Sequence, residues 1–394
     1  MKTILFGAAH YYSGNIIVGS QNYARQFSKA GWSVAYISTF LSPFKILFHK
    51  DKVAIQRQRE NFKKNGEQID ENLWSFTPFT FIPHHNKTIF DSKWLLENYY
   101  RFSPVNFRKL LKKKGFDIPV DALWIDSPNM NFLKKLLNPR LSIYRVIDNI
   151  RGFRIHGENV IRAEDKAIEF SDIVLVASKV LTEKYRLKFT EKNIVHCPNG
   201  ANLDNFIRNS YNFPSDLKGI PGKKVLYLGG IGEWFDVDLL TYAADRLPDT
   251  SFIIVGYDRA GVFRGIRHKN IYLLGRKQYS EVPDYIYHCD LGIIPFKNSE
   301  LVQTVHPIKM YEFFCLGKPV VSTSWEELRM VDTPCHLAAT HDQFVDLIDS
   351  DDLHHSHSPD DLVKFARSNS WSARYQFVVN QINSISTPVP HRSE

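Results

Sequence analysis

Short apolar runs alternate with helix-like segments along the whole chain. In the first half, the runs typical of buried strands are Thr3–Ala8, Ser33–Ser38, Ala122–Asp126, Ser142–Ile147, Ile173–Ala177 and Ile194–Cys197, and Trp74–Pro83 could form another. In the second half they are Lys224–Leu228, Ser251–Val255, Ile271–Leu274, Leu291–Ile294 and Pro319–Ser322. Strands that alternate with helices favour parallel sheets, so the pattern predicts an α/β protein.

Helical periodicity fills the gaps between these runs. The predicted helices lie near Gln21–Ala30, Asn131–Leu136, Ile161–Phe170, Val180–Leu187, Asp238–Leu247, Glu281–Tyr287, Pro307–Leu316 and Trp371–Ile385. The strand–helix series therefore runs twice, and 394 residues exceed one ordinary core.

The stretch 200–223 is rich in Gly, Pro and Asn and lacks periodicity, which is typical of an interdomain linker. We expect an N-terminal domain over 1–205 and a second domain over 206–370. The remaining segment, 371–394, would form a helix that could cross back to the first domain, followed by a mobile tail.

Composition narrows the class of protein. Apolar residues make up 43% and charged residues 23%, as in soluble globular proteins. The four cysteines lie far apart, which does not favour zinc or redox use. No stretch approaches the ~20 apolar residues of a membrane span, and the first apolar run is too short for a signal peptide. We expect a cytoplasmic protein, and the net charge of +8 favours anionic partners.

Glycines follow successive strands of the second half. V-L-Y-L-G-G-I-G-E-W-F-D, Val225–Asp236, is a strand, a Gly-rich turn and a helix start; Gly256 ends the next strand, and Arg276 follows a glycine that ends the third. Phe296 follows the fourth strand. Ligands bind outside the carboxyl ends of strands in doubly wound sheets. The alternative is that the glycines serve only tight turns.

The stretch H-P-I-K-M-Y-E-F-F-C-L-G-K-P-V-V-S-T, His306–Thr323, carries the candidate chemistry. Lys309 and Glu312 lie one turn apart on the predicted helix, so they share a face. A lysine there can reach a diphosphate, and a carboxylate can accept two ribose hydroxyls. The alternative is a surface ion pair that binds nothing.

The region Val225–Thr323 resembles the donor-binding domain of GT-B glycosyltransferases, whose helix–G-x-P-V-V–strand signature is similar to the stretch above. Within that class the chain is similar to bacterial exopolysaccharide and cell-wall enzymes, such as the xanthan glucuronosyltransferase and teichuronic-acid-type transferases. The resemblance implies two Rossmann-like domains that face a central cleft, with donor in the second and acceptor in the first.

The resemblance also implies a set of site residues. Lys309 would hold the donor diphosphate and Glu312 the ribose, with the remaining donor contacts at Gly230, Ile231, Gly256, Arg276, Phe296 and Met310. One departure concerns stereochemistry. Many retaining enzymes of the class carry a second glutamate eight positions before the first, where this chain has Thr304, and Glu300 lies further away. We therefore expect inversion.

An inverting transferase needs a general base for the acceptor hydroxyl, and a carboxylate can serve. Asp148 ends a buried strand, and Y-R-x-x-D is similar to the place of the catalytic Asp in the xanthan glucuronosyltransferase. The alternative is a helix cap or an ion-pair partner of Arg145 or Arg151. His10 is a second base candidate, although a structural hydrogen-bonded histidine is also consistent with its position. Asp126 ranks below Asp148.

Other residues of the first half would border the acceptor. Gly14 and Gly19 fit a cleft loop. Arg151, with Arg154, His156, Glu158 and Arg162, could position an anionic acceptor. Further along, His196–Asn202 resembles the P-N-G-V-D hinge entry of GT-B proteins, and Asn199 could touch the donor.

Basic and aromatic residues interleave at 44–64 and 94–116. Such segments can lie on an anionic bilayer, so we expect a peripheral protein at the inner membrane face. The alternative is a pair of amphipathic helices that pack onto the first domain.

The resulting prediction is a metal-independent glycosyltransferase that needs no cofactor. It would use a nucleoside-diphosphate sugar, with uridine diphosphate first among the donors, and a lipid-linked or polysaccharide acceptor. The alternatives are a GT-B-like sugar-nucleotide epimerase and, from charge alone, a basic nucleic-acid-binding protein. The sequence leaves the sugar, the base, the acceptor, the stereochemistry and the oligomeric state open.

Overall fold

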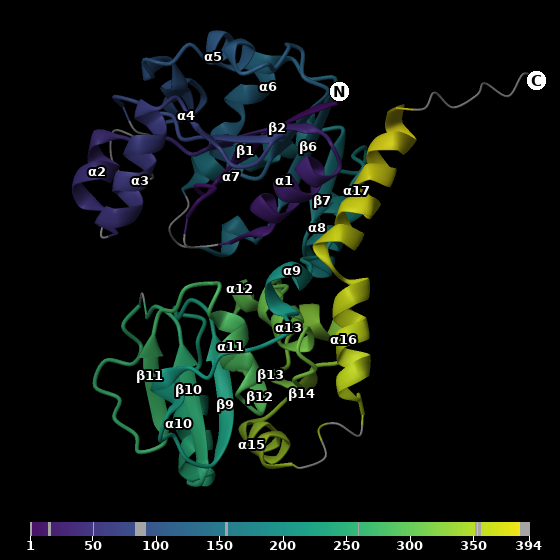
Figure 1. Cartoon of the computed structure of the whole chain (residues 1–394). Coiled ribbons are helices and arrows are strands. Elements are labelled where there is room, and N and C mark those ends of the chain that lie inside the picture. The colour runs from purple at the N-terminus through teal and green to yellow at the C-terminus, as the bar shows by residue number, and fades with distance from the viewer. Residues whose placement is uncertain are drawn as a thin grey trace, which may run out of the picture. The chain divides into compact units, whose positions relative to one another are not determined.

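The chain forms two compact units in a computed structural model that describes residues 2–14, 17–49, 51–82, 92–153, 157–258, 260–350, 353 and 356–386 (Figure 1). The first unit comprises Met1–Ala177, Leu181–Cys197 and Tyr375–Glu394, and the second Ser178–Val180 and Pro198–Arg374. The break after Cys197 precedes the expected boundary after 205. Helix α17 (Trp371–Ser386) is divided between the units, so the chain returns to the first unit within it. The predicted tail, beyond 386, lies outside the described residues.

An eight-stranded sheet forms the centre of the first unit, in the order β3-β4-β2-β1-β5-β6-β7-β8. Neighbouring strands are parallel except for β3 and β4, which are antiparallel. The strands are β1 (Thr3–Ala8), β2 (Ser33–Ser38), β3 (Glu67–Gln68), β4 (Leu73–Phe76), β5 (Ala122–Ile125), β6 (Leu141–Val146), β7 (Ile173–Val176) and β8 (Ile194–His196). Six of them match predicted runs closely, and β4 overlaps the start of the seventh.

Alternate residues of these strands supply two buried faces, as the pleat requires. On one face, Leu5 and Leu123 belong to an apolar cluster shared with the covering helices. On the other, Phe6 and Trp124 have ring centroids 5.3 Å apart. Such continuous burial explains why the strands read as apolar runs rather than as alternating ones.

Helices connect the strands of the first unit: α1 (Gly19–Lys29), α2 (Pro43–Phe48), α3 (Lys52–Lys63), α4 (Lys93–Asn98), α5 (Phe107–Lys113), α6 (Phe132–Leu137), α7 (Glu158–Phe170) and α8 (Lys179–Lys188). Figure 1 shows α2 and α3 together at the edge of this unit. Their boundaries follow local chemistry, because Ser42 accepts a hydrogen bond from the Lys45 backbone and Asp51 one from that of Ala54. Among the described residues, no helix is long and apolar enough to cross a membrane.

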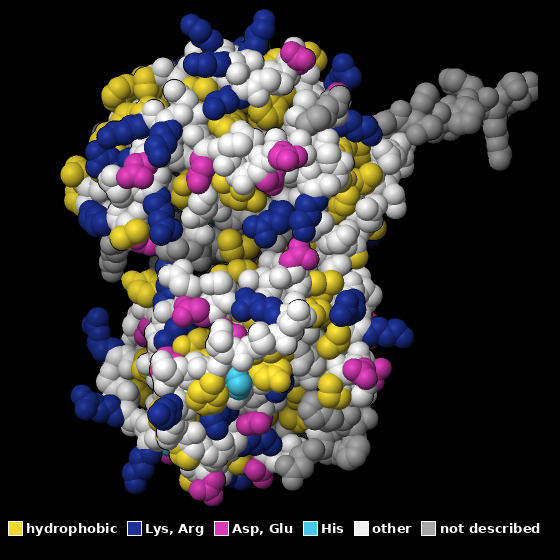
Figure 2. Space-filling model, viewed as in Figure 1, with side chains coloured by type: hydrophobic (Ala, Val, Ile, Leu, Met, Phe, Trp, Pro, Cys, Tyr) yellow, Lys and Arg dark blue, Asp and Glu magenta, His cyan; other side chains and the backbone are white. Residues whose placement is uncertain are grey.

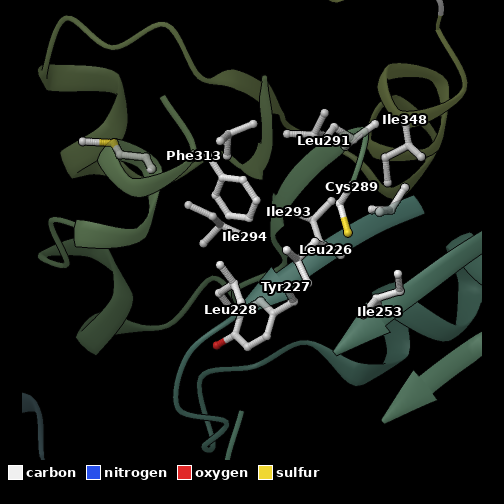
Figure 3. Close-up of a cluster of buried hydrophobic side chains, with 14 of the residues drawn as sticks. Leu226, Tyr227, Leu228, Ile253, Cys289, Leu291, Ile293, Ile294, Phe313 and Ile348 are labelled. Carbon is white, nitrogen blue, oxygen red and sulfur yellow. The ribbon is translucent and has the colours of Figure 1, made fainter. Parts of the chain in front are cut away.

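The second unit contains a six-stranded parallel sheet in the order β11-β10-β9-β12-β13-β14. Its strands are β9 (Lys223–Leu228), β10 (Thr250–Val255), β11 (Ile271–Gly275), β12 (Leu291–Ile294), β13 (Val320–Thr323) and β14 (His336–Ala338). Figure 3 shows part of its core, where side chains from β9, β10 and β12 meet Phe313. The short edge strand β14 lacks a recognisable pattern and was not predicted.

The helices of the second unit are α9 (Leu203–Phe206), α10 (Val237–Arg246), α11 (Val282–Tyr287), α12 (Glu300–Gln303), α13 (Ile308–Phe314), α14 (Glu326–Met330), α15 (His341–Asp349) and α16 (Pro359–Ser368). The predicted linker 200–223 is not a free connection, because Phe206 and Leu217 are buried in this unit's core. Turn-forming residues surround Phe206 and Leu217 in the sequence, so composition alone indicated a linker and not two buried side chains.

Candidate active site

Helix α13 presents Lys309 and Glu312 on one side of the second unit. Met310, Tyr311, Phe313 and Phe314 are buried and fix the helix against the sheet, which leaves Lys309 and Glu312 half-buried. This division follows from helical spacing, since positions three apart lie on the same face. The predicted pair therefore stands where the sequence pattern expects it on the helix.

The amine of Lys309 lies between two aromatic rings. Its Nζ is 4.3 Å from the Tyr227 ring centroid and 4.7 Å from that of Phe296, and it donates to the Tyr227 hydroxyl at 3.1 Å. Cation–π attraction favours this position. Burial nevertheless lowers the pKa of Lys309 to about 7, against the opposing charge of Glu312.

Glu312 has a tyrosine partner of its own. Its Oε1 accepts a hydrogen bond from the Tyr279 hydroxyl at 3.2 Å. Burial raises the pKa of Glu312 to about 7, although Tyr279 and Lys309 oppose the rise. Each member of the predicted pair is thus held by a hydroxyl, and no ion pair within 4.0 Å joins their described side chains.

The Gly-rich turn after β9 lies directly beside Lys309. Gly229 has a φ of +130°, and a Cβ there would stand 3.0 Å from Lys309 Nζ. A Cβ on Gly256 would stand 1.9 Å from the Gly229 carbonyl oxygen, so this neighbour must also be glycine. The exposed Gly230 turns its carbonyl to the Tyr227 hydroxyl, which donates to it at 2.8 Å. The glycines therefore serve close backbone approach around the lysine.

The other predicted donor residues differ in accessibility. Ile231 is buried, and its backbone bridges to Asp258. Phe296 is buried and stacks on Trp325 at 5.6 Å, so one ring face is already occupied. Arg276 is exposed just after β11.

Met310 differs from these residues because its side chain lies in the core, near Cys335 and Thr333. A role of that side chain in packing is favoured. Only its backbone remains for a donor contact.

Tyr227 and Tyr279 are the site residues that sequence reasoning missed. Figure 3 shows the Tyr227 hydroxyl turned away from the labelled apolar side chains around it. The available signal was a tyrosine inside an apolar strand, two residues before the first glycine of the turn. Tyr279 lies between β11 and α11, and nothing in its local pattern indicates a site.

The candidate acids of the first unit stand just beyond neighbouring parallel strands, β5 and β6. Asp126 is buried and accepts a hydrogen bond from the Ala9 backbone at 2.9 Å, and its other oxygen has no hydrogen-bond partner among the described residues. Burial raises the pKa of Asp126, whereas the nearby Ser20 hydroxyl, the Ala9 N–H and the charges of Arg145 and His10 oppose the rise.

Asp148 is exposed, in contrast to Asp126. Partial desolvation by the surrounding protein raises the pKa of its carboxyl, and the charge of Arg145 opposes that rise. No capping hydrogen bond from Asp148 is present among the described residues, so the alternative role as a helix cap has no support there.

The remaining predicted residues lie around these acids. His10 follows β1 with an exposed ring, and burial of its surroundings lowers its pKa while Asp126 opposes the change. Gly14 closes a turn in which its N–H donates to the Tyr11 carbonyl. Arg151 forms an ion pair with Asp165, so this carboxylate already neutralises part of the charge of Arg151.

Arg154 and His156 lie outside the described residues. Thr304 is buried and its hydroxyl donates to the Leu301 carbonyl, so a side chain without charge occupies the place of the second glutamate of retaining enzymes.

Comparisons with known proteins connect both units to one class. Residues 6–177 match the family "Glucuronosyltransferase GumK, N-terminal domain", and residues 222–349 match "Glycosyl transferases group 1". The chain is a GT-B glycosyltransferase related to GumK. The expected fold class is thereby confirmed, and the family decides against the nucleic-acid-binding interpretation.

A relative and several solved structures agree with this assignment. TuaH of Bacillus subtilis (strain 168), named as a teichuronic acid biosynthesis glycosyltransferase, is 32% identical over 179 residues, which are 44% of this chain and 45% of TuaH. Sucrose-phosphate synthase from Thermosynechococcus elongatus has a TM-score of 0.69 at 13% identity, covering 98% of this chain and 99% of its own. Anabaena Alr3699/HepE, in complex with UDP and glucose, has a TM-score of 0.64 at 15% identity, covering 98% and 100%. These structures share the GT-B fold with this chain.

Proposed function

We propose that this GT-B glycosyltransferase moves a sugar from a nucleoside-diphosphate sugar to a lipid-linked or polysaccharide acceptor, with inversion and without a metal. The observation that carries the proposal is the amine of Lys309, held by Tyr227 and Phe296 beside the glycine turn after β9. A cation at the carboxyl edge of a parallel sheet suits a diphosphate. The UDP complex of Alr3699/HepE makes uridine diphosphate the first donor to test.

Lys309 would act on the leaving group. As the bond between the anomeric carbon and the diphosphate oxygen breaks, negative charge grows on that oxygen, and an ammonium group stabilises it. A diphosphate also favours the protonated amine, so donor binding would raise the lowered pKa of Lys309. Glu312 would accept the ribose hydroxyls beside it.

Asp148 would act on the acceptor. Its carboxylate takes the proton of the acceptor hydroxyl while that oxygen forms the new bond to the anomeric carbon. A raised pKa brings a carboxylate closer to the range that suits a general base, and exposure leaves room for an acceptor. Asp126, which is buried, is the second candidate.

The two basic–aromatic segments support membrane contact unequally. In 44–64, helix α2 has no buried residue, and Phe44, Leu47, Phe48 and Val53 are 46%, 66%, 69% and 63% exposed. In 94–116, Trp94 is exposed, but Leu95, Tyr99, Phe107 and Leu111 are buried. We therefore assign contact with an anionic bilayer mainly to 44–64, where Arg59 and Lys63 are exposed cations.

Figure 2 shows Lys and Arg side chains next to hydrophobic ones on the side of the first unit where α2 and α3 lie. Rings in the headgroup layer with cations above them match such a surface. This contact would bring the first unit to a lipid-linked acceptor at the inner face of the cell membrane.

A thermal-shift screen of the full chain with uridine, guanosine and thymidine diphosphate sugars tests the donor assignment. A ligand that binds only the folded state raises the midpoint, and we expect the largest rise with one diphosphate sugar, unchanged by EDTA. Absence of a shift with every donor would refute the proposal. Product analysis with donor alone would reveal an epimerised sugar if the enzyme were an epimerase.

A further inference from the structure

The first unit contains a pocket of about 400 Å³ that none of the predicted site residues lines. Its walls come from the loop after β1, from α3 and from the start of β3. Because β3 is antiparallel to β4, Glu67 at its start lies opposite Ser75, close to the carboxyl end of β4. The pocket therefore lies at the same edge of the sheet as Asp126 and Asp148, where ligands of such sheets bind.

A carboxylate is fixed in one wall of this pocket. The hydroxyls of Tyr11 and Ser13 both donate to Glu67 Oε2, at 3.3 and 3.1 Å. The other oxygen, Oε1, makes no hydrogen bond among the described residues. It is consequently oriented by its partners and free to accept a hydroxyl group from a ligand.

Two cations line the pocket as well. Arg57 lies on α3, and Lys64 is the residue that directly follows this helix; both line the pocket. They are seven positions apart, which corresponds to two helical turns and therefore to one face. Neither forms an ion pair within 4.0 Å with another described residue, although Glu60 lines the pocket between them. Tyr11 lines the same pocket. Burial raises the pKa of Tyr11, and the charge of Arg57 opposes that rise.

We propose that this pocket binds an acidic sugar unit of the acceptor, with its carboxylate on Arg57 and Lys64 and a hydroxyl on Glu67. The inference rests on the proposed transferase function and names the acceptor chemistry. A guanidinium pairs with a carboxylate through two parallel hydrogen bonds. A neutral sugar would leave Arg57 and Lys64 with only the Glu60 and Glu67 carboxylates of the lining nearby, and a simple anion would leave Glu67 without a hydroxyl.

Binding of methyl glucuronide, methyl glucoside and acetate to the full chain, measured by saturation-transfer NMR and calorimetry, tests the proposal. We expect the glucuronide to bind at least about tenfold more tightly than either of the others, since each lacks one set of charge-assisted bonds. Inorganic phosphate serves as a further probe; if it binds as tightly as the glucuronide, the pocket is a general anion site and the proposal is wrong.

A matched pair of variants separates the pocket from overall charge. R57A/K64A should weaken glucuronide binding about tenfold. R59A/K63A removes the same charge from exposed positions of the same helix outside the pocket lining, and should change binding less than about twofold. Equal losses in both variants would overturn the proposal. E67Q, which keeps the size of the side chain, should weaken glucoside and glucuronide alike.

Donor binding distinguishes failure of this inference from failure of the proposed function. The midpoint rise caused by a uridine diphosphate sugar should be the same in R57A/K64A as in the unmodified chain. If the donor binds but the glucuronide does not, the acceptor inference fails alone. If the glucuronide binds but no donor does, the transferase proposal fails, and with it the acceptor role of the pocket.

Discussion

The two sheets of this protein present their ionisable groups in different ways. In the second unit, Lys309 and Glu312 are each held by a tyrosine hydroxyl before any ligand is present. In the first unit, Asp148 is exposed and Asp126 keeps one oxygen without a hydrogen-bond partner among the described residues. In the function proposed above, this difference corresponds to a donor site held in place before the ligand binds and to acceptor-side groups that gain partners only from the substrate.

Asp148→Asn should have the largest effect, because it removes the proposed base. We expect turnover to fall roughly 10²- to 10⁴-fold while donor binding stays unchanged. Steady-state kinetics and calorimetry with the donor measure the two quantities, and Asp117→Asn, an exposed acid of the same unit, is the control. Full activity of the variant would refute the role, and a larger loss in Asp126→Asn would move it to Asp126.

Lys309→Ala tests the proposed donor site of the second unit. Loss of a charge-assisted contact to the diphosphate should weaken donor binding about 10- to 100-fold, and turnover should fall as well. Calorimetry with a uridine diphosphate sugar measures the affinity. Lys269→Ala, at an exposed position of the same unit, should leave it unchanged. Unaltered affinity in Lys309→Ala would mean that this cation does not hold the donor.

The double variant F44S/F48S sharpens the contrast by testing the membrane surface of the first unit. The two rings are 4.7 Å apart and exposed, so their loss should weaken binding to vesicles with anionic lipid about tenfold without unfolding the protein. Flotation with vesicles measures the bound fraction. Leu187→Ser, at a position 84% exposed outside this surface, should bind normally. Equal binding of all three proteins would exclude α2 as the contact.

Tyr227→Phe removes the hydroxyl that holds Lys309 and the Gly230 carbonyl but keeps the ring. A rise of about three- to tenfold in the donor Kd is expected, since a net hydrogen bond contributes little more. The control is Tyr242→Phe, a half-buried tyrosine whose hydroxyl donates to Asp342 in the same unit. If Tyr227→Phe binds donor normally, Lys309 needs no positioning by that hydroxyl.

The smallest effect concerns stability and pH. Lys309 has a pKa of about 7 in the folded chain against an ordinary 10.5, so the unfolded chain binds more protons between these values and stability rises with pH there. Lys309→Met should therefore unfold about 2–4 °C higher than the unmodified chain near pH 7, and the gap should close towards pH 10. Glu312, with its pKa raised to about 7, acts in the opposite direction below pH 7 and is present in both proteins. Thermal scans without donor measure the two unfolding temperatures. A difference between them that stays constant from pH 7 to pH 10 would mean that the pKa of Lys309 is not lowered in the folded chain.

Local patterns were sufficient for most of the fold. Buried parallel strands are apolar throughout, so β1, β2 and β12 could be predicted with their observed bounds. The short elements β3 and β14 could not, because two or three residues carry no periodicity. The linker prediction for 200–223 was incomplete for a related reason, since isolated apolar residues such as Phe206 reveal their burial only when a core surrounds them.

Sequence alone determined the two α/β halves, the strand-end glycines and the shared face of Lys309 and Glu312, because these depend on spacing within one strand or helix. Only the tertiary structure brought Tyr227 to Lys309 across 82 positions, and only it separated 44–64, which exposes Phe44 and Phe48, from 94–116, which buries Tyr99, Phe107 and Phe116. The physical reason is the same in each case. Composition fixes which side chains favour contact with cations, lipids or apolar neighbours, whereas the packing of distant segments decides which of those neighbours each side chain meets.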